Sequence, residues 1–155
     1  MVPNGRDLLG TSANHKELLK WLPHHAWVHI ACHGLYNDNA PFENAFILAD
    51  GPLTLRDIMT TRLTCAEFAF LSACQTAASS SLVPDEVLHL CAGMQFCGFA
   101  SVVGTQWPVM DDIATDLAQA FYKELFRGEN KGRLNYSAEA LHSSFSKCMG
   151  NQWNI

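Results

Sequence analysis

A cysteine and a histidine in this 155-residue sequence stand where they could act together as nucleophile and base. Cys74 comes shortly after the apolar run 67–71, and His33 comes directly after the apolar run 26–32, 41 positions earlier. A thiol is a useful nucleophile only as thiolate or with a base nearby to take its proton. We therefore expect nucleophilic chemistry if the fold brings these two residues together.

The remaining cysteines and histidines give weaker signals. Their spacing includes no Cys-x-x-Cys pair, so neither a zinc cage nor a redox motif is indicated. His29 and His33 have the spacing of a metal pair, but their segment is not helical and lacks the glutamate of zinc peptidases. We expect no metal and no cofactor. In a reducing compartment, the other cysteines are expected to be small buried free thiols: Cys32, Cys65, Cys91, Cys97 and Cys148.

The hydrophobic pattern predicts short strands. The runs 26–32 and 67–71 carry apolar residues on both faces, which is typical of strands buried on both faces, and 99–104 predicts a third strand. Residues 46–49, followed by Asp50-Gly51 and then Pro52-Leu53, predict a strand and a tight turn, which the proline places near a sheet edge.

Helices are predicted between these strands. Ser12 is expected to cap a helix over 12–22, and Thr54 a short helix with Asp57 three positions on. Further helices are expected from 86 to about Gly98, after Asp112, and over 137–148. The apolar stripes expected to be buried are Val87, Leu90, Cys91 and Met94 in the first of these, and Ile113, Leu117, Ala120, Phe121 and Leu125 in the second.

Alternating strands and helices predict one α/β domain with a largely parallel sheet and helices on both faces. The length suits a single domain over residues 1–155. Ligands of such sheets bind beyond the carboxyl ends of the strands. His33, Gly34 and Cys74 are all predicted at that end, which makes it the expected site.

Composition argues against a nucleic-acid-binding, secreted or membrane-spanning protein. Charged residues make up 16% of the chain, the formal net charge is −5, and no cluster of Lys and Arg stands out, so nucleic acid is not an expected partner. Residues 1–10 lack the apolar run of a signal peptide, and no segment reaches the roughly 18 apolar residues of a membrane helix. We expect a cytoplasmic protein with no membrane partner.

Four ordered motifs resemble the CHAT domain, a family related to caspases, metacaspases and separases. They are 28–34 (VHIACHG), 70–77 (FLSACQTA), 84–86 (PDE) with 92–94 (AGM), and 101–111 (SVVGTQWPVMD). The likeness covers nearly the whole chain. It implies a caspase-like three-layer sandwich. The His-before-Cys order also suits caspases, in which the histidine lies about 50 residues upstream.

By this resemblance, His33 and Cys74 match a catalytic dyad, and the backbone N–H groups of Gly34 and Cys74 match an oxyanion hole. Asp111 matches a separase aspartate that reads a basic residue before the cut, so cleavage after Arg or Lys is implied. The alternative for Asp111 and Asp112 is helix capping with favourable charge at the helix start.

Two functions remain open from the sequence. One is a cysteine endopeptidase that acts on protein or peptide substrates, and the other is an inert caspase-like module that binds regulatory protein partners. The segment 72–76 departs from the Gln-Ala-Cys-x-Gly form of caspases, so specificity for Asp is not expected. Compared with the family, the domain looks truncated at its ends. The polar loop 77–83 is a candidate processing or activation segment.

Overall fold

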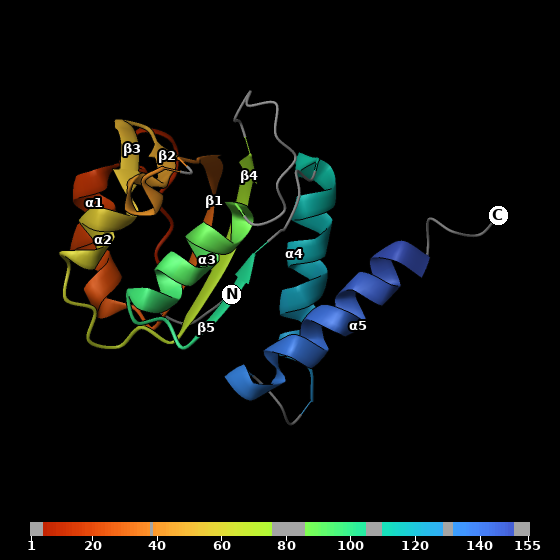
Figure 1. Ribbon diagram of the computed structural model, residues 1–155. Helices are drawn as coiled ribbons and strands as arrows, with labels where there is room; N and C mark the ends of the chain where they lie inside the picture. The colour runs from red at the N-terminus through yellow and green to blue at the C-terminus, as the bar shows by residue number, and fades with distance from the viewer. Residues whose placement is uncertain (1–4, 38, 76–85, 105–109, 129–131, 151–155) are drawn as a thin grey trace. The chain divides into compact units, whose positions relative to one another are not determined.

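A computed structural model of the chain describes residues 5–37, 39–75, 86–104, 110–128 and 132–150 (Figure 1). The chain divides into two compact units, residues 1–108 and 109–155, which we describe separately. In chain order the elements are η1 (Gly10–Ser12), α1 (His15–Trp21), η2 (Leu22–His24), β1 (Trp27–Leu35), η3 (Pro41–Glu43), β2 (Ala45–Leu48), β3 (Gly51–Thr54), α2 (Leu55–Met59), β4 (Phe68–Gln75), α3 (Glu86–Phe96), β5 (Ser101–Gly104), α4 (Asp111–Leu125), η5 (Leu134–Tyr136) and α5 (Ser137–Gly150).

The first unit is built on a five-stranded sheet in the order β3-β2-β1-β4-β5. β1 pairs with β4, and β4 with β5, in parallel, whereas β1 pairs with β2, and β2 with β3, in antiparallel fashion. The sheet is therefore mixed, parallel on one side of β1 and antiparallel on the other, rather than largely parallel. Pro52 lies on β3, an outer strand, as its lack of an N–H predicts.

The two central strands run further than their apolar residues predict. β1 continues through His33 and Gly34 to Leu35, and β4 continues through Cys74 to Gln75. A polar or small residue does not end a strand whose backbone is paired with a neighbour, and β1 and β4 pair with each other up to Gly34 and Gln75. The two residues of interest thus lie inside strands, not in the loops after them.

Burial differs between these strands. Residues 68–71 of β4 are all at most 3% exposed, which confirms a strand buried on both faces. In β1, Ile30 and Gly34 are buried while His29, Ala31 and His33 are exposed. The expectation that β1 is buried on both faces is therefore wrong: its residues alternate, as in a strand with one face against the core.

Three helices cover one face of this sheet. Their apolar side chains form one core with alternate residues of the strands, among them Ile30 from β1 and Leu71 from β4. The helical members are Leu18, Leu19 and Leu22 from α1 and η2, Leu55 and Ile58 from α2, and Leu90, Cys91 and Met94 from α3. Each fully buried side chain of this kind contributes roughly 1.5–3 kcal/mol.

Helix ends show which local signals were correct. Thr54 caps α2 as predicted: its hydroxyl accepts the N–H of Asp57 at 3.1 Å, and the Asp57 carboxylate accepts the N–H of Thr54 at 3.0 Å. Gly98 after α3 has a φ of 113°, which suits the glycine predicted there. The prediction that Ser12 caps the first helix is wrong. The N-cap of α1 is Asn14, whose side chain accepts the N–H of Glu17.

Gly93 explains how α3 approaches α2 closely. A Cβ atom built on Gly93 would lie 2.3 Å from Cδ1 of Leu55, a side chain only 1% exposed. Such a contact is closer than any real Cβ contact, so the glycine of the 92–94 motif permits the packing of these two helices.

The second unit contains the helices α4 and α5. Lys147 of α5 donates to Oε1 of Glu124 on α4 at 2.5 Å, which ties the two helices together. Phe121 and Leu125 are buried as predicted, whereas Ile113 is 36% exposed and does not belong to the buried stripe.

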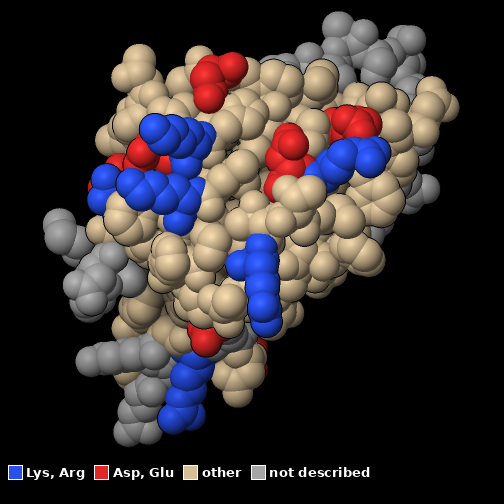
Figure 2. All heavy atoms as spheres, turned by 90° about the vertical axis from the view of Figure 1, so that its left-hand side faces the viewer, with Lys and Arg blue, Asp and Glu red and all other residues tan. Residues whose placement is uncertain are grey.

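The surface matches the low charge of the sequence. On the face drawn in Figure 2, Lys and Arg lie among Asp and Glu, and uncharged residues cover most of the area. No single-sign patch for a polyanion is visible on this face. Within the described ranges, no helix is long and apolar enough to cross a membrane.

Candidate active site at the ends of β1 and β4

The structure brings His33 and Cys74 together as Cα partners on neighbouring parallel strands. Paired strands lie about 4.8 Å apart, so the two backbones are adjacent at this point. His33 is on the exposed face of β1. The pairing of β1 with β4 thus brings together two residues that lie 41 positions apart in the sequence.

Gly34 is paired on both sides. Its partners are Phe46 on β2 and Gln75 on β4. A Cβ atom at this position would lie 3.0 to 3.2 Å from the ring and hydroxyl of Tyr36. A side chain larger than hydrogen at this position would therefore press on Tyr36.

His29 lies on the same face of β1 as His33. Its Nε2 is 3.2 Å from the hydroxyl of Ser72, and its ring packs 4.9 Å from that of Phe70, both on β4. Desolvation by neighbouring atoms lowers the pKa of His29, although the side chain keeps an exposed surface. Nothing in the sequence indicated the contact with Ser72, which is 43 residues away and carries no local signal.

Three other thiols, one beside His33 on β1 and two in or just after α3, are poor nucleophiles. Cys32 donates its S–H to the carbonyl of His33 at 3.3 Å, and desolvation raises its pKa to about 11 against a smaller opposing effect of the Ile47 backbone. Desolvation also raises the pKa of Cys97 to about 11 and raises that of Cys91. A thiol with so high a pKa is almost entirely protonated near neutral pH.

Asp111 begins α4 and therefore belongs to the second unit, so its place beside the dyad stays a prediction. Met110 is the N-cap of this helix and makes no side-chain cap hydrogen bond. The side chain of Asp112 accepts the N–H of Ile113 at 2.8 Å. This contact supports the capping role that the sequence offered as an alternative for Asp112. The loop 77–83 lies outside the described residues.

The described part of the chain holds no group of three or more His, Cys, Asp or Glu side chains arranged to bind a metal ion. The arrangement that remains is a histidine and a cysteine on adjacent strands. A pair of this kind can carry out acyl transfer.

Comparison with known families decides the relationship. The family model described as CHAT domain matches residues 2–153. The chain belongs to the CHAT domain family. This confirms the resemblance inferred from the four motifs, and it makes this CHAT domain a relative of cysteine peptidases. A search of curated proteins found no match.

Proposed function

We propose that this CHAT domain is a cysteine endopeptidase in which Cys74 is the nucleophile and His33 the acid–base residue. The observation that carries the proposal is the register of β1 and β4, which makes the two residues Cα partners. Strands hold their side chains more precisely than loops do, which is what a nucleophile and its base require.

The reaction we propose has two steps. The thiolate of Cys74 attacks the peptide carbonyl, the C–N bond breaks, and His33 gives a proton to the leaving amine. His33 then takes a proton from water as that water attacks the thioester, the C–S bond breaks, and the carboxylic acid leaves, which restores the thiolate of Cys74 and the protonated His33. The exposure of His33 supports this proposal, because both the amine and the water must reach the imidazole.

Further parts of the site belong to the same proposal. We place the oxyanion near the N–H groups of Gly34 and Cys74, and we assign recognition of a basic residue to Asp111. A caspase-like three-layer arrangement would put helices on the second face of the sheet as well. The substrate is a protein or peptide, and the four cysteines that are free among the described residues suit a cytoplasmic, reducing setting.

One observation favours a second candidate, an inert interaction module. Gly34 is paired with strands on both sides, and a residue of a central strand normally directs its N–H into the ladder. An oxyanion hole that used this N–H would require the ladder to open locally. A domain that never opens there would keep the fold without turnover.

A peptide library that varies the residue before the cut separates these functions. We expect the wild type and the control Cys65→Ala to cleave after Arg or Lys, and we expect Cys74→Ala to be inactive. Asp111→Ala should lose the preference for basic residues, while its neighbour variant Asp112→Ala should keep it. Cleavage by Cys74→Ala would contradict the site, and a folded wild type that cleaves nothing would favour the interaction module.

A further inference from the structure

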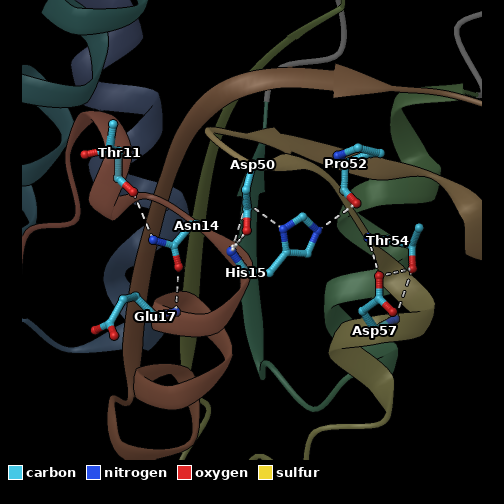
Figure 3. Close-up of polar contacts among 8 residues, drawn as sticks. All are labelled: Thr11, Asn14, His15, Glu17, Asp50, Pro52, Thr54 and Asp57. Carbon is cyan, nitrogen blue, oxygen red and sulfur yellow. Dashed lines mark hydrogen bonds and ion pairs between the residues drawn. The ribbon is translucent and has the colours of Figure 1, made fainter.

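His15 links two parts of the first unit that are far apart in sequence (Figure 3). It is the first residue of α1, and its ring lies between Asp50 and Pro52 at the turn from β2 to β3. Nδ1 is 2.6 Å from Oδ1 of Asp50, and Nε2 is 2.8 Å from the carbonyl oxygen of Pro52.

The partners of the two ring nitrogens fix the charge of this histidine. The carbonyl of Pro52 can only accept a hydrogen bond, and so can an ionised Asp50. Both nitrogens of His15 must therefore donate, which only the imidazolium can do. The hydrogen bond to the Pro52 carbonyl, followed by that to Asp50, raises the pKa of His15 above 6.5, in agreement with this geometry.

Backbone contacts complete the link. The N–H of His15 donates to both carboxylate oxygens of Asp50, at 3.1 and 3.2 Å. The N–H of Ala49 donates to the carbonyl of Ala13 at 2.9 Å. Residues 13–15 are thus joined to residues 49–52 by three pairs, Ala13–Ala49, His15–Asp50 and His15–Pro52.

The strand held in this way is the one beside the candidate site. Ile47 and Phe46 of β2 are the register partners of His33 and Gly34 on β1. We propose that His15 is a protonation-dependent clamp that fixes the β2–β3 hairpin to α1 and thereby holds the strand paired with His33 and Gly34. The clamp rests on its own contacts, and only its effect on catalysis rests on the proposed function.

The direction of the pH dependence follows from the charges that face His15. These are Asp50 at the turn and Asp57 on α2, and both favour the imidazolium. Because the folded state raises the pKa of His15, the stabilisation is complete below 6.5 and is lost as the pH rises through the folded value. Desolvation raises the pKa of Asp50, but the hydrogen bonds from His15 outweigh this and lower it, so that the carboxylate persists into mild acid.

Amide hydrogen exchange at Ala49 tests the clamp without substrate or turnover. We expect the protection factor of this amide, corrected for the intrinsic rate, to fall about tenfold between about pH 6 and pH 9, as NMR shows His15 losing its proton. His15→Gln and Asp50→Asn should give the low protection at every pH. The control His24→Gln, at an exposed position in η2, should behave as the wild type.

Protection of Ala49 that stays constant while His15 titrates, or a His15 pKa at the ordinary value, would overturn the clamp. The wild-type titration decides this even if a variant does not fold. If the protection follows His15 but no peptide is cleaved, the clamp stands and the peptidase proposal fails. If a peptide is cleaved but the protection of the Ala49 amide does not change with pH, the peptidase proposal stands and the clamp fails.

Discussion

His33 and Cys74 are Cα partners on the parallel strands β1 and β4, within a register that runs unbroken from Trp27 and Phe68 to Gly34 and Gln75. A shift by one residue along this ladder would separate the pair and turn one of them to the other face. Side chains that fix the register therefore also fix the site. The Trp27–Phe68 and His29–Phe70 ring contacts lie on this same pair of strands.

Thiol reactivity should separate the described cysteines. Cys65 is exposed, whereas desolvation raises the pKa of Cys32 and Cys97 to about 11. At neutral pH such a thiol holds roughly one thiolate in ten thousand. We expect iodoacetamide to alkylate Cys65 at least about tenfold faster than Cys32 or Cys97, measured by peptide mass spectrometry. Equal rates in the folded protein would contradict the burial of these two thiols.

Gly34→Ala should destabilise the fold by about 1–2 kcal/mol, because the added methyl group would press on the ring of Tyr36. Urea unfolding of the single and double variants measures this cost. In a Tyr36→Leu background the same change should cost clearly less, since the ring is gone. An identical cost in both backgrounds would show that the ring is not what excludes a side chain at this position.

Gly93→Ala should also be destabilising, by about 1–2 kcal/mol. Overpacking against Leu55 costs about 1–3 kcal/mol, and the better helix propensity of alanine returns up to about 1 kcal/mol. Gln95→Ala, at an exposed position of the same helix, is the matched control and should be neutral or stabilising. Gly93→Ala that raised the midpoint of thermal unfolding would contradict the close packing of α3 on α2.

The cap of α2 should contribute to stability in a pH-dependent manner. Hydrogen bonds from the Thr54 side chain, and then from its backbone, lower the pKa of Asp57 below 3.8. A lowered pKa gives stability that is present above 3.8 and is lost as the pH falls through the folded value. Asp57→Asn should therefore flatten the acid side of the stability profile and cost about 1 kcal/mol at neutral pH. The same substitution at the exposed Asp7 should do neither.

The sequence was sufficient to predict those structural features that depend only on residues close to one another in the chain. The turn at Gly51, with a φ of 130°, and the reciprocal hydrogen bonds of Thr54 and Asp57 both follow from residue types within a few positions. Apolar runs also located β1, β2, β4 and β5 to within a few residues, whereas β3 was predicted only as a turn and the segment after it. The family motifs also single out His33 and Cys74 as candidate site residues from the sequence alone.

Features that depend on distant pairing were missed. His33 and Gly34 look like a strand end in sequence, but partners on β2 and β4 extend β1 beyond them. The antiparallel half of the sheet and the exposed face of β1 follow from topology, which periodicity does not encode. His15 meets Asp50 across 35 residues, and no local pattern marks either residue as part of a clamp.

Mass-spectrometric labelling with an Arg-terminated peptide acyloxymethyl ketone tests the dyad most directly. The chain should be compared as wild type, Cys74→Ala and His33→Ala, with His24→Ala as the matched histidine control and Cys65 as the internal reference for an exposed thiol. The dyad predicts an adduct on Cys74 in the wild type and in His24→Ala, and at least about a hundredfold slower labelling in His33→Ala. An adduct on Cys74 that forms equally fast without His33, or labelling of Cys65 alone, would contradict it.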